Sequence, residues 1–416
     1  MAGNTAFMIA GAGLAGAKAA QTLRAEGFDG PVVLLGEEQE RPYERPPLSK
    51  GYLMGTAERE SVYAHPPHWY AEHDVELRLG TTVTGIDPAG HTLTLDDGSR
   101  HGYAKLLLTT GSAPLPLPVP GADFGGVHYL RRLADSDALK ETLRTAGRIV
   151  VIGGGWIGLE TTAAARAAGV EVTLLEMAEL PLLRVLGREV AQVFAALHTD
   201  HGVTLRCGVR VAEITGAGGR ADGVRLADGT HIPADAVVVG VGIAPCSGLA
   251  EAAGLDVDNG VLVDAQLRSS HPDIHAAGDV ANAFHPLLGR HLRVEHWANA
   301  LHQPQTAARA MLGQDVNYDR LPYFFTDQYD LGMEYTGHVE PDGYDQVVFR
   351  GNPEAREFIA FWLSDGRVLA GMNVNIWDVT DPIRALVTSG RRIDPGRLAD
   401  ASVPLADLLD APGTAA

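Results

Sequence analysis

The sequence has few cysteines, no long apolar run and no excess of positive charge. Its two cysteines, Cys207 and Cys246, lie far apart and outside any C-x-x-C spacing, so we expect neither a disulfide framework nor a cysteine redox centre. No stretch approaches the ~20 apolar residues that are needed to cross a bilayer. The net charge of −19 disfavours nucleic acid and anionic membranes as partners.

Metal-binding and targeting signals are also missing. Among the 16 histidines there is no H-E-x-x-H motif, and the pair His271 and His275 encloses Pro272 in a strand-like run, so no metal site is expected. Met1–Asn4 carries no basic segment, so we expect no signal peptide and a cytoplasmic protein.

Glycine is abundant, with 49 residues, and the pattern G-x-G-x-x-G occurs twice. One copy is weak evidence, because glycine-rich turns are common. Here, however, each copy follows a short apolar run, Ala6–Ala10 or Ile149–Ile152, and precedes an Ala-rich, helix-like stretch. This context predicts two strand–turn–helix units, each with a dinucleotide pyrophosphate at the helix N-terminus.

The three glycines of each copy have separate roles. The first permits the tight turn, the second lets the backbone approach the pyrophosphate, and the third lets the helix pack on the strand. In order, these glycines are Gly11, Gly13 and Gly16 in the first copy and Gly153, Gly155 and Gly158 in the second.

An acidic residue completes each motif about 20 residues further on, where a carboxylate accepts hydrogen bonds from the adenosine ribose. Glu37 follows the apolar run Val32–Leu35, and Glu176 ends the run Val172–Leu175. A 2′-phosphate would be repelled there. Since no arginine directly follows Glu176, the second site is predicted to prefer NADH over NADPH.

The repeat and the composition predict three domains. Four prolines at alternate positions from Pro114 to Pro120 are typical of a linker. The segment Ile274–Asp279 is typical of a further strand of the first domain. The region from Tyr323 predicts antiparallel strands with turns at Gly351-Asn352 and Asp365-Gly366. The predicted divisions are a discontinuous first domain at 1–113 and 246–322, a second at 114–245, and an α+β domain at 323–416.

Besides these two motifs, the sequence contains several further characteristic segments: ERPYERPPLSK, TTGSAP, GLE, AAGDV, EHWANA and DQYDLG. As a set they resemble the FAD-dependent ferredoxin reductases of bacterial oxygenase systems. The resemblance covers residues 5–405. It implies an α/β, glutathione-reductase-like fold with two Rossmann-like domains, the first for FAD and the second for NAD, plus a C-terminal α+β domain over the flavin.

The resemblance assigns cofactor roles by position. For FAD it implies Gly11, Gly13, Leu14, Ala15, Gly16, Glu37, Arg45, Lys50, Val83 (through its backbone), Thr110, Gly111, Arg131, Asp279, Glu295, His296 and Trp297. For NADH it implies Gly153, Gly155, Trp156, Ile157, Gly158, Glu160, Glu176 and Gly242. Simpler readings stay open for several of these: Asp279 as a helix cap, Trp297 as a core residue, Arg131 with Arg132 as an exposed pair, and Lys50 and Glu160 as ordinary surface residues.

Lys50 and Glu160 are the candidate catalytic residues. In the family the lysine approaches the reactive edge of the flavin and pairs with the glutamate, which lies near the nicotinamide. A paired lysine would stay cationic and favour the anionic reduced flavin. The hydride passes directly between the rings, so no acid, base or nucleophile from the protein is required.

One segment departs from the family. Tryptophans are usual where this chain has Tyr323–Tyr329, which keeps an aromatic surface of altered shape. Dithiol reductases and flavin peroxidases need cysteines near the loop that here reads Arg-Pro-Pro-Leu-Ser-Lys, so both are excluded. A rubredoxin or small-quinone reductase and a flavoprotein related to apoptosis-inducing factor remain as alternatives.

The expected partner is a small acidic ferredoxin that binds transiently, and the protein is expected to be a monomer or weak dimer. Two anionic proteins must meet through a local patch of opposite sign. The candidate residues for this patch are Arg290, Arg293, Arg309, Arg391 and Arg392.

The ribose acids lead to a first prediction. The purified protein should be yellow, carry one non-covalent FAD and prefer NADH, and Glu176→Arg should shift the preference toward NADPH by removing the repulsion of a 2′-phosphate. Steady-state kcat/KM with both nucleotides measures this. Equal efficiency with NADH and NADPH in the parent protein would contradict the assignment of Glu176.

Overall fold

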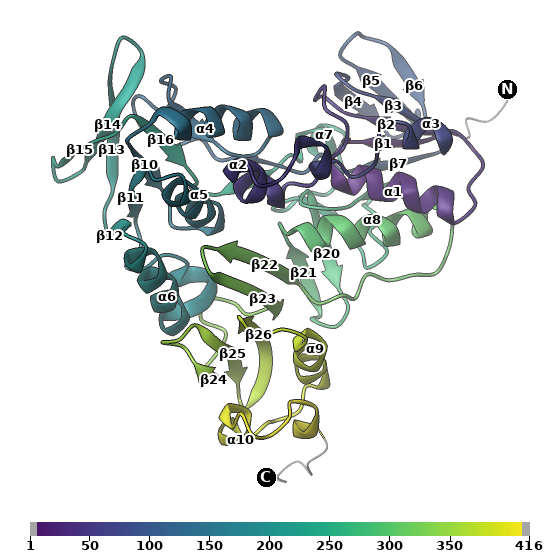
Figure 1. The fold of residues 1–416 in the computed structure, drawn as a ribbon. Coiled ribbons are helices and arrows are strands. Elements are labelled where there is room, and N and C mark those ends of the chain that lie inside the picture. The colour runs from purple at the N-terminus through teal and green to yellow at the C-terminus, as the bar shows by residue number, and fades with distance from the viewer. Residues whose placement is uncertain (1–5, 410–416) are drawn as a thin grey trace. The chain divides into compact units, whose positions relative to one another are not determined.

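The computed structural model describes residues 6–409 and divides them into two compact units (Figure 1). The first unit comprises Met1–Arg45, Glu58–Ala113 and Ile243–Arg320. The second comprises Pro46–Ala57, Pro114–Gly242 and Leu321–Ala416. Met1–Asn4, on which the expectation of no signal peptide rests, lies outside the described residues.

A five-stranded parallel sheet forms the core of the first unit. Its strands, in spatial order, are β19 (Ile274–Ala276), β7 (Lys105–Leu108), β1 (Phe7–Ala10), β2 (Val32–Leu35) and β3 (Val75–Arg78). Strand β19 pairs directly with β7, although more than 160 residues separate them. The two parts of the discontinuous unit thus share one sheet.

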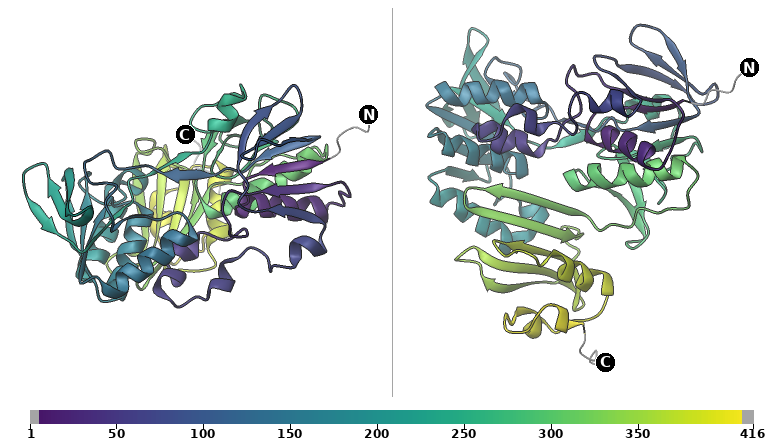
Figure 2. Two further views of the ribbon diagram at one scale, coloured as in Figure 1. Left: turned by 90° about the horizontal axis from the view of Figure 1, so that it is seen from above. Right: turned by 45° about the vertical axis from the view of Figure 1, so that its right-hand side comes forward.

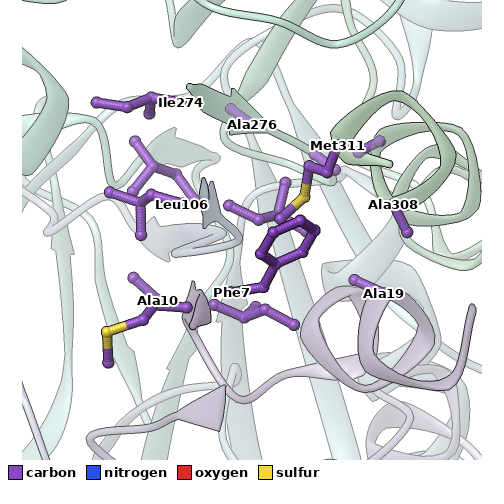
Figure 3. Close-up of a cluster of buried hydrophobic side chains, with 14 of the residues drawn as sticks. Phe7, Ala10, Ala19, Leu106, Ile274, Ala276, Ala308 and Met311 are labelled. Carbon is purple, nitrogen blue, oxygen red and sulfur yellow. The ribbon is translucent and has the colours of Figure 1, made fainter. Parts of the chain in front are cut away.

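Two helices, α1 (Leu14–Ala25) and α8 (Trp297–Met311), pack against each other and against this sheet. Figure 3 shows apolar side chains of the strands and helices meeting in the core, among them Phe7, Leu106 and Met311. Burial of these side chains stabilises the unit by roughly 1.5–3 kcal/mol per large side chain.

The remaining elements of the first unit lie outside the parallel sheet. They are the strands β4 (Val83–Asp87), β5 (Thr92–Leu95), β6 (Arg100–Gly102), β18 (Val261–Val263), β20 (Ala281–His285) and β21 (Arg290–Arg293), with η2 (Arg59–Val62), α3 (Trp69–Glu72) and α7 (Gly248–Ala252). The short strands β8 (Ser112–Pro114) and β17 (Ile243–Pro245) pair where the chain leaves and re-enters the unit.

The second unit contains another five-stranded parallel sheet. Its order is β12 (Thr204–Cys207), β11 (Glu171–Glu176), β10 (Arg148–Ile152), β16 (Ala236–Val239) and β9 (Val127–Tyr129). The helices of this part are α4 (Leu133–Thr145), α5 (Trp156–Ala167) and α6 (Leu183–Asp200). A three-stranded antiparallel sheet adds β13 (Val211–Ala217), β14 (Arg220–Leu226) and β15 (His231–Pro233).

The proline-rich segment Pro46–Ala57 belongs to the second unit, away from its neighbours in sequence. It forms η1 (Pro46–Ser49) and α2 (Gly51–Met54), which pack on α4 and α5. The hydroxyl of Ser136 donates to the carbonyl oxygen of Leu48 at 2.8 Å, and the hydroxyl of Tyr52 donates to Asp137 at 2.5 Å. These bonds hold the residue after η1, Lys50, beside α5.

The C-terminal part is a five-stranded antiparallel sheet with short helices. The strand order is β22 (Tyr323–Gln328), β23 (Leu331–Gly337), β26 (Arg367–Val374), β25 (Glu357–Ser364) and β24 (Gln346–Asn352). The helices are α9 (Thr380–Ser389), α10 (Pro395–Ala399) and η3 (Ala406–Leu408). Figure 2 shows this sheet, in green to yellow, from two further directions.

One predicted turn is correct and one is wrong. Asp365-Gly366 joins β25 to β26 with positive φ at both residues, as predicted. Gly351 and Asn352 instead lie inside β24, opposite Phe358 and Glu357. The turn follows them: the Asn352 side chain accepts hydrogen bonds from the backbone N–H groups of residues 354 and 355, which displaces the reversal beyond the glycine.

In both parallel sheets the central strand runs into a helix through a glycine turn of the same geometry. Gly153 has φ 104°, and a Cβ there would lie 2.3 Å from the carbonyl oxygen of Gly240. A Cβ on Gly158 would lie 2.0 Å from the carbonyl oxygen of Gly153, whereas a Cβ on Gly155 would meet nothing within 4 Å. The first and third glycines are therefore required by the fold, and the second is not.

Alanine substitution should separate these roles. Gly158→Ala forces a methyl group into a backbone carbonyl, so the free energy of unfolding should fall by about 1–3 kcal/mol. Gly155→Ala is the matched control and should leave it within about 0.5 kcal/mol of the parent. Urea denaturation followed by circular dichroism measures both. A larger loss for Gly155→Ala than for Gly158→Ala would show that this packing is misassigned.

Candidate active site

The first glycine turn lies between β1 and α1. Gly11 has φ 121°, and a Cβ on Gly16 would lie 2.2 Å from the carbonyl oxygen of Gly11. Gly13 is the N-cap of α1, it makes no side-chain capping bond, and a Cβ on it would meet nothing within 4 Å. The backbone N–H groups at the start of α1, at Leu14 and Ala15, thus adjoin open space suited to an anion.

The second turn repeats this arrangement between β10 and α5. Gly155 is the N-cap of α5, again without a side-chain cap. Ile157, on the first turn of the helix, is an exposed apolar residue, while Trp156 packs edge-on against Phe194 and near Phe324. Trp156 therefore contributes its backbone to the turn and its ring to the core.

The two predicted ribose acids lie beside their glycine turns. Glu37 is exposed and follows Gly36, whose Cβ would lie 2.5 Å from that of Ala12 in the first turn. Oε2 of Glu176 accepts a hydrogen bond of 2.6 Å from the backbone N–H of Gly154, and its Oε1 accepts one of 2.7 Å from that of Ala178. Both carboxylates are positioned for a ribose at the carboxyl edge of their own sheet.

Asp279 is a nearly buried carboxylate at the same edge as the first turn. Its Oδ2 accepts a hydrogen bond of 2.9 Å from the hydroxyl of Ser112. A Cβ on the preceding Gly278 would lie 3.2 Å from Cβ of Ala15, so the AAGDV segment touches the first glycine turn. Asp279 lies between the end of β19 and the start of β20, so it does not cap a helix.

Thr110 and Gly111 follow β7 at this edge and are held by Cys246. The Thr110 hydroxyl donates to the carbonyl oxygen of Cys246, and the Cys246 N–H donates to that of Gly111, both at 2.8 Å. Cys246 itself is exposed, and both of these bonds use its backbone. Burial raises the pKa of the Cys207 thiol to about 11, which disfavours its thiolate.

The EHWANA segment leads into α8. His296 is the N-cap of this helix and Trp297 is its first residue. Desolvation lowers the pKa of His296 to about 4, opposed by the nearby charge of Asp279, so the imidazole is neutral at pH 7. Glu295 forms an ion pair with Arg293. The segment thus places a neutral imidazole near the Asp279 carboxylate.

Three other residues predicted to bind FAD lie away from the first glycine turn in sequence, and each has different contacts. Arg45 forms an ion pair with Glu38 at 3.6 Å and also lies over the ring of Tyr43. Val83 is buried at the start of β4, so only its backbone is available. Arg131 lies in the second unit, where its backbone N–H donates to Asp135 at the start of α4.

Lys50 and Glu160 meet inside the second unit. Nζ of Lys50 lies 2.7 Å from Oε1 of Glu160, whose side chain is 5% exposed. The hydroxyls of Ser49 and Thr326 also donate to this carboxylate, the second at 2.5 Å to Oε1. The ring of Phe325 lies 5.5 Å from Nζ. The predicted ion pair is present, and Ser49, Thr326 and Phe325, from two segments of the chain, lie around it.

Sequence reasoning missed the two hydroxyls around Glu160. Ser49 directly precedes Lys50 and could have been inferred from that position, but Thr326 is distant in sequence and no local pattern connects it to Glu160. It also missed exposed apolar residues at the carboxyl edge of the second sheet. Met177, 58% exposed, follows Glu176, and Val241 lies beside Gly242, which has φ 117°.

We also searched residues 6–409 for a metal site and for a membrane-spanning helix. No three histidine, cysteine, aspartate or glutamate side chains are grouped there so as to hold a metal ion. His275 is buried, which lowers its pKa to about 3 and favours the neutral ring. In the same range no helix has the length and apolar character to cross a membrane.

Comparison with known proteins agrees with this geometry. Residues 5–304 match the family described as pyridine nucleotide-disulphide oxidoreductase, and residues 323–409 match the reductase C-terminal family. A 5,5'-dehydrodivanillate O-demethylase ferredoxin reductase subunit from Sphingobium sp. (strain NBRC 103272 / SYK-6) is 42% identical over 98% of both chains. The anthranilate 1,2-dioxygenase system ferredoxin–NAD(+) reductase component from Burkholderia cepacia is 41% identical over 97% of this chain and 99% of its own.

A solved structure is similar throughout. The covalent putidaredoxin reductase–putidaredoxin complex contains a chain that superimposes with a TM-score of 0.93 at 37% identity, covering 99% of this chain and 100% of that one. The predicted family, fold class and pair of cofactors are confirmed. The chain belongs to the pyridine nucleotide-disulphide oxidoreductases and, within them, to the FAD- and NAD(H)-dependent ferredoxin reductases of oxygenase systems.

Proposed function

We propose that this protein is an NADH-dependent reductase that passes electrons singly to a small iron–sulfur ferredoxin, which in turn supplies an oxygenase such as a haem-thiolate monooxygenase. The observation that carries this proposal is the duplicated glycine turn with its ribose acid, once in each unit. The loop that carries cysteine in dithiol reductases here carries Ser49 and Lys50.

The domain division that we propose follows the three large sheets. An FAD domain comprises 1–113 and 246–322, an NAD domain 114–245, and a C-terminal domain 323–416. The pairing of β19 with β7 supports a discontinuous FAD domain. The segment Pro46–Ala57 is continuous in sequence with the FAD domain but packs with the second unit.

The residues of the first unit are suited to hold FAD. Gly13, Leu14 and Ala15 present backbone N–H groups to a pyrophosphate, and Glu37 accepts from a ribose. Asp279, aligned by Ser112, accepts from a further hydroxyl. We assign Arg45, Val83, Thr110, Gly111, Glu295, His296 and Trp297 to the same site. Arg131 and Lys50, for which the family resemblance also implies an FAD role, belong to the second unit.

The residues of the second unit are suited to hold NADH. Gly155, Trp156 and Ile157 start the helix that faces the pyrophosphate, and Glu176 accepts from the ribose. Gly153, Gly158 and Gly242 keep the edge of the sheet open by backbone conformation. Met177 and Val241 add apolar surface next to it.

When bound, FAD accepts a hydride from NADH and supplies the two electrons one at a time to an acceptor. The contribution of the chain is orientation and charge. Lys50, fixed by Glu160, places a positive charge that favours a negatively charged ring system. The hydroxyls of Ser49 and Thr326 donate to the Glu160 carboxylate and fix its orientation.

Two substitutions test this assignment. Lys50→Met and Glu160→Ala should slow reduction of the flavin by NADH by on the order of 10- to 100-fold, because the group that orients the reaction is lost or unanchored. FAD content should stay near that of the parent, since the first unit supplies most of the binding groups. Rapid-mixing absorbance and the bound-flavin spectrum measure the two effects.

Lys140→Met is the matched control, because this lysine lies on α4 over the ring of Tyr52 and takes no part in the Glu160 cluster. It should leave both quantities unchanged. Loss of FAD from the Lys50 and Glu160 variants, with normal reduction of the flavin that remains, would make these residues structural.

The proposed acceptor is a small acidic ferredoxin that docks transiently, burying roughly under 1,200 Å². Among the arginines predicted for its docking surface, Arg293 is unsuitable: its side chain is 10% exposed and bonded to Glu295 and Asn259. Arg309 and Arg392 are paired with Glu26 and Asp365, which reduces their local charge. We keep Arg290 and Arg391 as separate candidates, each tested by its own charge reversal. We also propose a monomeric or weakly dimeric, cytoplasmic protein.

Turnover tests the proposed function. With putidaredoxin as the probe, NADH-dependent cytochrome c reduction should be far faster than the reaction with oxygen and should fall as salt screens the docking charges. Arg290→Glu and Arg391→Glu should each lower the rate and its salt dependence. Arg144→Glu, an exposed residue on α4, is the control.

Other outcomes have definite meanings. Faster turnover with rubredoxin or menadione would identify a rubredoxin or quinone reductase. Reduced flavin that persists for long periods with every acceptor would indicate a binding flavoprotein of the kind related to apoptosis-inducing factor. If both charge reversals left the rate and its salt dependence unchanged, this docking surface would be wrong even though the reductase activity stood.

A further inference from the structure

A chain of hydrogen bonds leads from Glu160 into the C-terminal sheet. The Thr326 hydroxyl lies 2.5 Å from Oε1 of Glu160, and Nε2 of Gln328 lies 3.2 Å from Oγ1 of Thr326. All three side chains are buried. Thr326 and Gln328 are two residues apart on β22, so their side chains share one face of the strand.

The chain continues to helix α6. Oε1 of Gln328 lies 2.9 Å from Nε2 of His198, and Nδ1 of His198 lies 3.2 Å from the hydroxyl of Tyr329. His198 is fully buried, and burial lowers its pKa to about 4. Its ring is therefore neutral at pH 7, with one nitrogen that donates and one that accepts.

The chemistry of Glu160 determines the direction of every bond in this chain. An ionised carboxylate only accepts, so the Thr326 hydroxyl must donate to it, and Oγ1 of Thr326 is then left to accept from Nε2 of Gln328. Oε1 of Gln328 consequently faces His198 and accepts a hydrogen bond from it, so Nε2 of His198 carries the proton. The Tyr329 hydroxyl donates to the remaining nitrogen, Nδ1. All four bonds thus point toward the carboxylate.

Such an alignment stabilises negative charge at its end. Each donor in the chain is polarised by the one behind it, and in a water-excluded setting the bonds strengthen one another. A carboxamide has no labile proton to exchange along such a chain, so Gln328 does not suit proton transfer. The chain is suited to holding charge and orientation.

We infer that Thr326, Gln328 and His198 are positioning residues that hold Glu160 as an oriented carboxylate for Lys50. This inference rests on the proposed role of the Lys50–Glu160 pair and extends it to α6 and β22, which carry no cofactor motif. Tyr329 closes the chain, and its ring stacks on His201 at 3.8 Å between centroids.

Few other charges act on Glu160. Lys50 precedes α2, and neither α2 nor η1 contains a charged side chain. Asp327 on β22 is an acid that interacts with the pair. Desolvation raises the pKa of Asp327, the charge of Lys50 lowers it, and the charge of Glu160 raises it. Three charged residues lie on β10 and β11, the strands next to α5. Glu176 accepts a hydrogen bond from the backbone of the glycine turn. Arg148 and Glu171 are the first residues of their strands, at the opposite end of the sheet from that turn. Around His198 the titratable neighbours are His201 and Tyr329.

The test compares Thr326→Val, which removes the hydroxyl at nearly constant volume, with Thr326→Ser, which retains it. In the valine variant of the holoenzyme the ratio of protonated to ionised Glu160 at a given pH should rise about tenfold or more, as for loss of one hydrogen bond to a charged group. Infrared absorption of the protonated carboxyl measures this ratio, with Glu160→Gln to assign the band. Thr326→Ser should restore the behaviour of the parent.

The rate of flavin reduction by NADH, measured against pH in rapid mixing, gives the second readout. The acid limb should move to higher pH in Thr326→Val, and by a smaller amount in His198→Leu, which breaks the chain at its far end and leaves Thr326 in place. Thr336→Val, the same change at a buried site on β23, should move neither readout. If Thr326→Val does not fold, the His198 variant carries the test.

An unchanged carboxyl band and an unchanged acid limb in folded Thr326→Val or His198→Leu would overturn the inference. Failure of the proposed function is distinguishable from this result, because the infrared readout needs no NADH and no ferredoxin. If the carboxyl band shifted and the pH–rate profile did not, the hydrogen bonds would affect only the charge state of Glu160. That result would contradict their role in positioning Lys50.

Discussion

The structure around the reaction site depends on one buried carboxylate. Glu160 lies on the helix that begins at the second glycine turn, and it accepts bonds from Lys50, Ser49 and Thr326. These donors come from a proline-rich segment and from the C-terminal sheet. A buried charge that lost its partners would cost several kcal/mol, so the three segments are constrained to meet at this point.

The glycine turns impose a second constraint, in the backbone. In each parallel sheet the third glycine of the motif lies so close to the carbonyl of the first that a side chain cannot be accommodated. That contact brings the helix onto the strand and aims its free N–H groups at the space beside the second glycine. The first and third glycines of each motif therefore serve the packing of helix on strand, and the second leaves space for a nucleotide.

Prediction from sequence succeeded where the cause is local. The two glycine turns, the placement of Glu37 and Glu176 beside them and the Asp365-Gly366 turn each depend on short-range geometry, which residue type and spacing describe. The Gly351-Asn352 turn was predicted wrongly for a related reason: two turn-forming residues mark a reversal only approximately, and the side chain of Asn352 moved it toward the C-terminus. Arg293 was predicted to be a surface charge, but its side chain is 10% exposed and forms an ion pair with Glu295, two residues further along the chain.

By itself the sequence determined the two glycine turns, since each is a motif of fixed spacing, and its resemblance to the family supplied the fold, the cofactors and the pairing of Lys50 with Glu160. Only the tertiary structure decided that the segment Pro46–Ala57 packs with the second unit, and that Thr326, Gln328 and His198 stand behind Glu160. The physical reason is that hydrogen bonds between distant segments leave no periodicity in the chain. They arise when the burial of apolar side chains brings polar groups together, and each buried polar group must then find a partner.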